Sequence, residues 1–290
     1  MADNEFSNWG RWGTDDEIGA LNLVTPETTA AAIGSVKQGK VYSLASAIRE
    51  SNVPRLEFRA ANQHFVRVFG GPTRDVASVA DDVIVVGCHG ATTHIDALCH
   101  YWTGDKLYNG FPEDTVQGRG ALRLGIENVK SMVTRGVMLD VAAAKGVDYL
   151  DGGYIITRAD LDECCQKQGV ELRAGDVALF RTGWPRTYYE SPEKYNRSQP
   201  GLTWDSGMWF CERDVCAVGS DNSAIGVRTE APYEGANVHA LFLHQAGVYL
   251  IEMMELDELS RDKVYEFLFV MAPLLVLGAK GSSVNPLAIV

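Results

Sequence analysis

Short runs of β-branched and aliphatic residues recur along the chain, and several of them are apolar at every position rather than at alternate ones. A strand that is apolar on both faces must be covered on both sides, so these runs predict a sheet enclosed by other layers rather than one that faces water. The runs occupy residues 83–86, 136–139, 177–180, 215–218, 248–251 and 264–276.

Two segments carry the signals of a helix start. Thr25 is an N-cap type of residue followed by Pro26 at the first helical position, and an alanine-rich stretch comes next. Thr157 repeats the pattern, with Asp160 at the N3 position and Gly169 as the terminator. Helices interspersed with strands of this kind favour an α/β or α+β fold.

Chain length, composition and charge restrict the class of protein, the number of domains and the partners. With 290 residues, 46% of them hydrophobic and 22% charged, the chain falls in the ordinary globular range. No convincing linker interrupts it, so we expect one domain over residues 1–290, with residues 1–40 forming an N-terminal arm and helix. The balance of 26 Lys+Arg against 38 Asp+Glu gives a net charge of -12, which disfavours nucleic acid and anionic membranes as partners.

Three further features bear on cellular location. The longest apolar run, residues 267–279, is too short to span a bilayer and contains Pro273, so we expect a buried strand that bends or ends there. The acidic amino terminus lacks a secretion signal, which makes a cytoplasmic protein the expectation. The six cysteines show no zinc or disulfide spacing and are expected to be reduced and buried.

Three of the six histidines fall within a short segment, residues 88–100. His94, Asp96 and His100 are separated by even numbers of residues, so in an extended segment their side chains emerge on one face. His89 is out of phase with them. Gly90 follows it and can supply a bulge or tight turn that swings His89 back.

Two imidazoles and a carboxylate suit Zn²⁺, Mn²⁺ or Fe²⁺, and a ligand set without thiolate favours a catalytic metal with open positions over a structural zinc. The alternative is a satisfied core pair, in which His94 hydrogen-bonds to Asp96 or to a backbone carbonyl. The presence of His89 and His100 alongside favours the metal site.

A second set of candidates lies downstream. Residues 238–247 predict a short helix with two histidines, His239 and His244, whose spacing of five residues keeps them off a common helix face. We expect His244 to be a solvated surface residue. Glu252 ends the strand predicted at 248–251, where a carboxylate beside apolar bulk needs a cation or hydrogen-bond donors.

Other polar and aromatic residues receive structural interpretations. Arg181 is expected to meet a structural acid rather than a substrate carboxylate, and the acidic segments 81–82 and 220–223 are expected to be solvated turns. For the aromatic residues, ordinary core or interface packing is favoured over substrate stacking. The aromatic candidates are Trp9, Trp12, Phe65, Phe69 and Trp102.

Residues 93–100, Thr-His-Ile-Asp-Ala-Leu-Cys-His, resemble the H-x-G-T-H-x-D-x-P-x-H signature of the cyclase family of metal-dependent hydrolases, which includes bacterial kynurenine formamidase and isatin hydrolase. The resemblance extends to residues 8–22, 180–184 and 239–259, and thus through nearly the whole chain. There are three departures from the signature. They are Thr92 in place of glycine, Leu98 in place of proline, and a first histidine one residue early, at His89.

The resemblance implies a swivelling β/β/α-type fold, with a central mixed sheet or barrel flanked by helices. It implies a divalent metal held by two groups of residues, with the catalytic acid/base beside them. Isatin hydrolase-like members suggest manganese, and formamidase-like members suggest zinc. The implied ligands are His89, His94 and Asp96, with His239 and Glu252 completing a second metal position or a supporting shell, and the implied acid/base is His100.

The chemistry that follows is hydrolysis. A metal lowers the pKa of bound water from about 15.7 towards about 7 and polarises a carbonyl, and His100 can take a proton from that water and return it to the leaving atom. The family implies a small-molecule substrate, an aryl amide, cyclic imide, lactam or lactone. It also suggests a homodimer or homotetramer.

Two other functions are compatible with the same residues. The order His94-x-Asp96 with a distant His239 is also that of non-haem iron oxygenases. Oxoglutarate-type members of that class place an arginine soon after the distal histidine, whereas the next arginine here is Arg261, and His100 would have no role. The third possibility is a metal-binding or small-molecule-binding protein without turnover.

Overall fold

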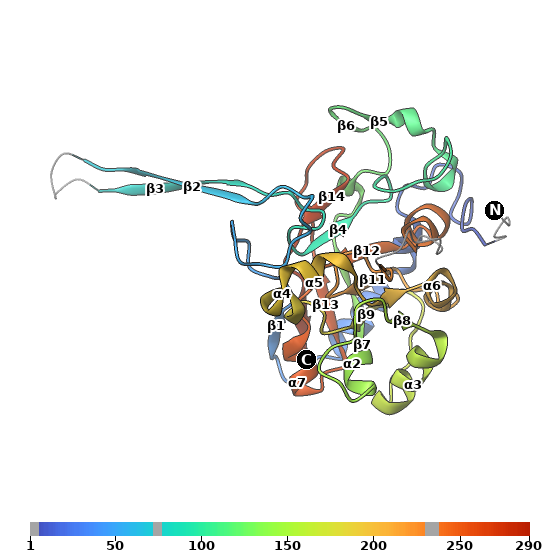
Figure 1. Cartoon of the computed structure of the whole chain (residues 1–290). Helices are drawn as coiled ribbons and strands as arrows, with labels where there is room; N and C mark the ends of the chain where they lie inside the picture. The colour runs from blue at the N-terminus through green and yellow to red at the C-terminus, as the bar shows by residue number, and fades with distance from the viewer. Residues whose placement is uncertain (1–5, 72–76, 230–237) are drawn as a thin grey trace.

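A nine-stranded mixed sheet forms the centre of the computed structural model, which describes residues 6–71, 77–229 and 238–290 (Figure 1). Its four central strands run parallel and the strands on either side are antiparallel, so the sheet is mixed as expected. In spatial order the strands are β1 (Val41–Ser43), β15 (Leu287–Ile289), β13 (Glu266–Met271), β7 (Met132–Asp140), β9 (Val177–Arg181), β11 (Ala217–Ser220), β12 (Tyr249–Glu252), β4 (His94–Asp96) and β14 (Gly281–Ser283).

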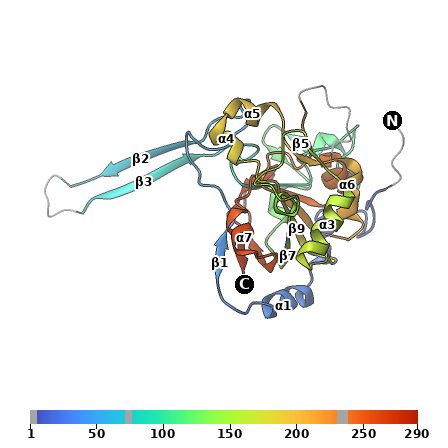
Figure 2. The ribbon, with the colours of Figure 1, turned by 60° about the horizontal axis from the view of Figure 1, so that its bottom comes forward.

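Helices flank this curled sheet, and short two-stranded sheets lie outside it (Figures 1 and 2). The helices are α1 (Pro26–Gly34), α2 (Val141–Ala144), α3 (Arg158–Gln168), α4 (Arg186–Glu190), α5 (Pro192–Arg197), α6 (Trp204–Cys211), the π-helix η5 (Ala240–Ala246) and α7 (Asp257–Asp262). Single turns of 3-10 helix occur at η1 (Gly19–Leu23), η2 (Tyr108–Gly110), η3 (Glu113–Thr115) and η4 (Ile126–Asn128). The small sheets are β8 (Ile155–Ile156) with β10 (Gly201–Leu202), β5 (Val116–Gln117) with β6 (Gly120–Ala121), and β2 (Gln63–Phe69) with β3 (Val79–Val85).

The central strands are the apolar runs of the sequence. Every residue of β9, β11 and β12 is buried, as expected of strands with other layers on both faces. The α/β class predicted from these runs is confirmed.

Both predicted helix starts are also confirmed. α1 begins at Pro26 and is capped by Thr25, and α3 begins one residue after Thr157. The Thr157 hydroxyl accepts a hydrogen bond from the Asp160 backbone N–H, and the Asp160 carboxylate accepts one from the Thr157 N–H in return. Gly169 then ends the helix in the left-handed conformation, with a φ of 68°.

Two expectations about strands are wrong in part. Residues 83–85 of the run at 83–86 belong to β3, but among the described residues β3 pairs with β2 alone, in a ribbon that projects from the body, and both strands are exposed throughout (Figures 1 and 2). The acidic pair at residues 81–82 lies inside β3 rather than in a turn. The run at 264–276 forms a strand only as far as Met271, and after Pro273 the chain leaves the sheet, so that Leu274 to Leu277 are exposed.

None of the helices described in the structure has the length and hydropathy that a bilayer crossing requires. All six cysteines are free thiols. Four of them are buried, whereas Cys88 and Cys165 are half-buried.

The capping box of α3 gives a stability prediction. Thr157→Ala removes the side chain that satisfies the Asp160 N–H, so we expect the free energy of unfolding to fall by about 1 kcal/mol in urea denaturation. Thr14→Ala, at an exposed threonine in a turn, is the control and should change stability by less than about 0.5 kcal/mol. Equal stability of the Thr157 variant and the wild type would contradict this role of the cap.

Candidate metal centre

Strand β4 places two of the predicted ligands on one face of the sheet. His94 and Asp96 are the first and last residues of the strand, and both are buried. β12 runs antiparallel to β4, with Glu252 directly opposite His94. Directly opposite residues of an antiparallel pair share a face, so these three side chains emerge together.

The imidazole of His239 lies close to both carboxylates. Its Nε2 is 3.2 Å from Glu252 Oε1 and 3.7 Å from Asp96 Oδ2. On the other side, His94 Nε2 is 3.5 Å from Asp96 Oδ1 and 3.4 Å from Glu252 Oε2. Each carboxylate therefore stands between two imidazoles, with one oxygen near each ring.

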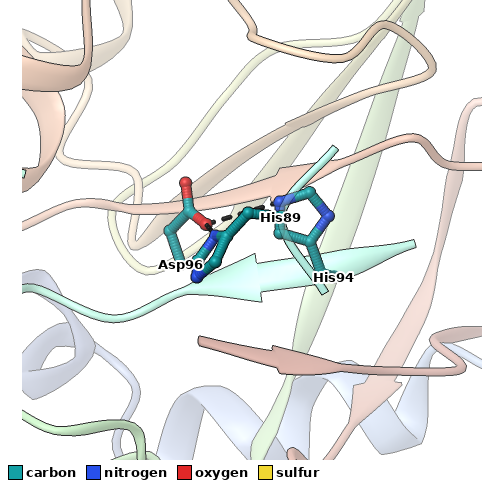
Figure 3. A group of neighbouring side chains, drawn as sticks. All are labelled: His89, His94 and Asp96. Carbon is teal, nitrogen blue, oxygen red and sulfur yellow. Dashed lines mark hydrogen bonds and ion pairs between the residues drawn. The ribbon is translucent and has the colours of Figure 1, made fainter. Parts of the chain in front are cut away.

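His89 reaches Asp96 by way of a turn at Gly90. Gly90 has a φ of 67°, and a side chain there would lie 2.9 Å from Cδ1 of Leu56. His89 Nδ1 is 2.8 Å from Asp96 Oδ1, so that His89 and His94 both approach the same carboxylate (Figure 3). The turn expected at Gly90 is present, and it offsets the odd spacing of His89.

Three buried polar atoms of this cluster, His94 Nε2, Asp96 Oδ2 and Glu252 Oε1, make no hydrogen bond within the described part of the chain, and their nearest ion-pair partners are 3.2–3.7 Å away. His94 Nδ1 donates to the carbonyl oxygen of Thr92 at 2.7 Å, so its Nε2 presents a lone pair to the carboxylates. Each unpaired buried polar group costs about 1–3 kcal/mol, and charged ones cost more. Imidazole with carboxylate is a suitable donor set for a divalent cation, which would give such atoms a partner.

The closeness of imidazoles and carboxylates in this cluster shifts the pKa values of both. Burial opposes protonation of His89, but the hydrogen bonds to Asp96 and Cys88 outweigh it and raise the His89 pKa to about 10. Burial also opposes ionisation of Asp96 and Glu252, yet the surrounding histidines hold the pKa of each carboxylate below its usual range. For His94, the nearby carboxylates outweigh burial and raise the pKa. A metal ion held by these residues would compete with such protons.

The ligand atoms form two overlapping sets. In one set His89, His94 and Asp96 offer atoms within 4.8 Å of one another, and in the other Asp96, His239 and Glu252 do so. Asp96 belongs to both sets through its two oxygens. Asp96 would therefore help to hold a divalent metal in either set.

The N-terminal segment holds the helix that follows His239. This π-helix, η5, begins directly after His239, and its last carbonyl groups accept hydrogen bonds from Asn8 and Trp9. The backbone N–H of Ala20 donates to Gly247 O at 2.8 Å, immediately after the helix. The segment that resembles the family's opening thus satisfies backbone groups that a helix end leaves unpaired.

The two remaining histidines singled out in the sequence, His100 and His244, occupy different positions. β4 ends at Asp96, and a turn follows in which the His100 N–H donates to Ala97 O. The expectation that His100 belongs to the same extended segment as His94 and Asp96 is therefore wrong. The His100 ring nevertheless stacks on His89 with centroids 3.9 Å apart, beside both ligand sets. Burial lowers the His100 pKa to about 4. The expectation of a solvated His244 is wrong, because Trp9 packs against its ring and leaves the residue only 4% exposed.

Comparison with known proteins gives the family of this chain. Residues 27–227 match the Cyclase family model. The chain belongs to the cyclase family. A crystal structure described as a novel cyclase is 36% identical, with 98% of this chain and 100% of that chain covered and a TM-score of 0.89.

Two solved isatin hydrolases share the cyclase fold at lower identity. Isatin hydrolase A from Ralstonia solanacearum is 21% identical, with coverage of 92% of this chain and 98% of that chain and a TM-score of 0.61. An isatin hydrolase bound to the product analogue thioisatinate is 19% identical, with coverage of 92% and 99% and a TM-score of 0.63. No curated protein sequence matched the chain.

Several residues that support the cyclase site were not identified from the sequence. Gly281 of β14 leaves room for His89, because a side chain there would lie 2.7 Å from the ring carbon Cε1. The Thr93 hydroxyl donates to Met253 O and accepts from the Ser46 N–H, which ties β4 to its surroundings. Thr93 directly precedes His94 in the motif, and this position is the one feature of the sequence that could have marked it as a supporting residue.

The expectations for Asp221 and Arg181, which lie at the ends of β11 and β9, are wrong for the first and confirmed for the second. Asp221 was expected in a solvated turn but is buried, and its carboxylate accepts hydrogen bonds from Thr182 and from the Gly183 N–H. Arg181 pairs with Asp140 at 3.0 Å and with Asp257 at 2.8 Å, which confirms its structural interpretation.

The unpaired acceptors lead to a prediction about metal content. We expect His94→Gln to weaken metal binding by more than the roughly 10–100-fold that loss of an outer-shell partner causes, because Nε2 faces both carboxylates. Metal analysis of protein purified without chelator measures this. His64→Gln, at an exposed histidine on β2, is the control and should retain full metal content. Unchanged metal content in the His94 variant would remove this residue from the ligand set.

Proposed function

We propose that this chain is a metal-dependent hydrolase that cleaves a C–N bond of an amide or cyclic amide, or a lactone C–O bond, in a small aromatic substrate. His89, His94, Asp96, His239 and Glu252 would hold the divalent metal, Mn²⁺ or Zn²⁺. The observation that carries this proposal is the buried cluster of two imidazoles and two carboxylates, in which three polar atoms have no hydrogen bond within the described residues and lie 3.2–3.7 Å from one another's side chains.

The relatives in the same fold support the substrate class. One isatin hydrolase binds the product analogue thioisatinate, and a structure from Bacillus stearothermophilus is described as a predicted metal-dependent hydrolase, with 21% identity, coverage of 86% of this chain and 97% of that chain, and a TM-score of 0.54. Hydrolysis of a cyclic amide is therefore the first reaction to test.

The bound metal would supply an activated water and a polarised carbonyl group. His100 stands beside the ligand sets, held by its stacking on His89. Its lowered pKa keeps the imidazole neutral at neutral pH, so a ring nitrogen is free to accept a proton. The imidazolium then returns that proton to the leaving nitrogen or oxygen.

The oxygenase alternative explains less of the site. A two-histidine, one-carboxylate triad would use His94, Asp96 and His239. It leaves Glu252 unexplained, although this carboxylate lies 3.2 Å from His239 and 3.4 Å from His94. His100 also has no role in that chemistry.

The test combines metal analysis with a spectrophotometric hydrolysis screen. The substrates are isatin, N-formylkynurenine and simple aryl lactones, each with and without added Mn²⁺ or Zn²⁺. Stoichiometric metal with metal-dependent ring opening or deformylation supports the proposal. Bound iron with oxygen uptake would favour the oxygenase, and metal without turnover of any of these compounds would count against this substrate class.

The acid/base assignment predicts the behaviour of one variant. We expect His100→Asn to retain its metal and to lose at least about 100-fold in kcat, the usual contribution of general acid–base catalysis. His64→Asn is the matched control and should keep wild-type turnover. Wild-type kcat in the His100 variant would exclude His100 from the proton transfers.

A further inference from the structure

The imidazole of His244 is buried outside the metal centre and is held from two sides. Its Nδ1 is hydrogen-bonded to the Thr103 hydroxyl at 3.1 Å. The ring of Trp9 packs edge-on against it, with centroids 5.1 Å apart, and the Trp9 indole N–H donates to the His244 carbonyl oxygen at 2.6 Å. A buried polar ring fixed in this way can in turn fix the segment that bonds to it.

Thr103 and His244 each follow a residue of the candidate site. Thr103 comes three residues after His100, and His244 comes five residues after His239. The rings of His100 and His239 lie close together, with centroids 6.3 Å apart. The hydrogen bond between Thr103 and His244 is therefore a second link between the two segments that carry these rings.

The π-helical form of η5 brings His244 to this position. His239 has helical backbone angles, and a π-helix bonds residues five apart rather than four, so His244 follows His239 by about one turn. One more contact lies at the end of η5, where a side chain at Gly247 would be 2.6 Å from the ring of Tyr108. The chain from His100 to Tyr108 thus runs alongside the helix.

Other hydrogen bonds of this stretch stay within it. The Trp102 indole N–H donates to the Glu113 carboxylate at 3.1 Å, and the Glu113 backbone N–H donates to Asp105 O at 3.1 Å. Such bonds shape the segment after His100 but do not place it against η5. The bond from Thr103 to His244 does so.

We propose that His244 is a positioning residue for His100, because its bond to Thr103 holds the segment after His100 against the helix that follows His239. This inference rests on the proposed function, in which His100 transfers protons beside a bound metal. Proton transfer needs heavy atoms about 2.6–3.2 Å apart, and a misplacement of about 1 Å can cost about 100-fold in rate. Loss of the bond should therefore lower kcat without removing the metal.

The test compares variants that lose the bond with variants that keep it. His244→Phe retains a ring against Trp9, and Thr103→Val keeps the shape of an exposed side chain, but neither forms the bond. We expect each to lower kcat at least about tenfold, with KM and metal content unchanged. His244→Asn and Thr103→Ser retain a hydrogen-bonding group and should restore most of the turnover.

Thr134→Val is the matched control. The Thr134 hydroxyl donates to Gly175 O at 2.9 Å in a buried part of β7, which three strands separate from β4. This variant should lose at least as much stability as Thr103→Val, because its bond is the more buried one, yet keep wild-type kcat. An equal fall in kcat in both variants would reduce the role of Thr103 to general stability and overturn the inference.

A His100→Asn background separates positioning from a structural role. If His244 acts through His100, adding Thr103→Val to His100→Asn should cost no further turnover, since the group that the bond positions is absent. A further tenfold loss in the double variant contradicts the inference. Loss of metal from Thr103→Val also contradicts it, because the bond would then act on the ligands.

Amide hydrogen exchange gives a readout that needs no turnover. The backbone N–H groups of His100 and Leu107 are both hydrogen-bonded, so their exchange reports opening of residues 100–107. We expect exchange there to be severalfold faster in Thr103→Val than in the wild type, and unchanged in Thr134→Val. A wild type that hydrolyses none of the compounds tested counts against the proposed substrate class, and exchange then decides alone. Equal exchange in Thr103→Val and the wild type overturns the inference.

Discussion

The antiparallel pairing of β4 with β12 is the interaction on which the candidate site depends. It sets Glu252 directly opposite His94 and places Asp96 on the same face. Side chains alternate along a strand, so a slip of one residue in this register would turn Glu252 away from both. Thr93, next to His94, resists such a slip, because its hydroxyl donates a hydrogen bond to Met253 O, directly after β12.

The site concentrates groups of opposite charge around two buried carboxylates. Asp96 and Glu252 are almost fully buried, and two carboxylates in such a place are stable only with cations beside them. The imidazoles of His94 and His239 provide positive charge when protonated, and a divalent ion provides more while leaving the rings neutral. The same electrostatic requirement explains the lowered carboxylate pKa values and the fit to a metal.

The sequence predicted features that depend on neighbouring residues better than features that depend on residues far apart in the chain. The cap at Thr157 and the turn at Gly90 were predictable because each depends on a few neighbouring residues. His244 was mispredicted because the residue that buries it, Trp9, lies 235 positions away along the chain. Apolarity alone could not place residues 83–86 either, since a covered strand of the main sheet and a strand of an exposed ribbon can have the same composition.

The separation of the candidate ligands in sequence has a consequence for folding. His94 and Glu252 meet only when the first and last thirds of the chain have been brought together through β4 and β12. Contacts between such distant residues form late, because closing a long loop costs entropy before the contact is gained. The full set of candidate ligands therefore depends on a long-range pairing, whereas His89, His94 and Asp96 lie within eight residues of one another in the sequence.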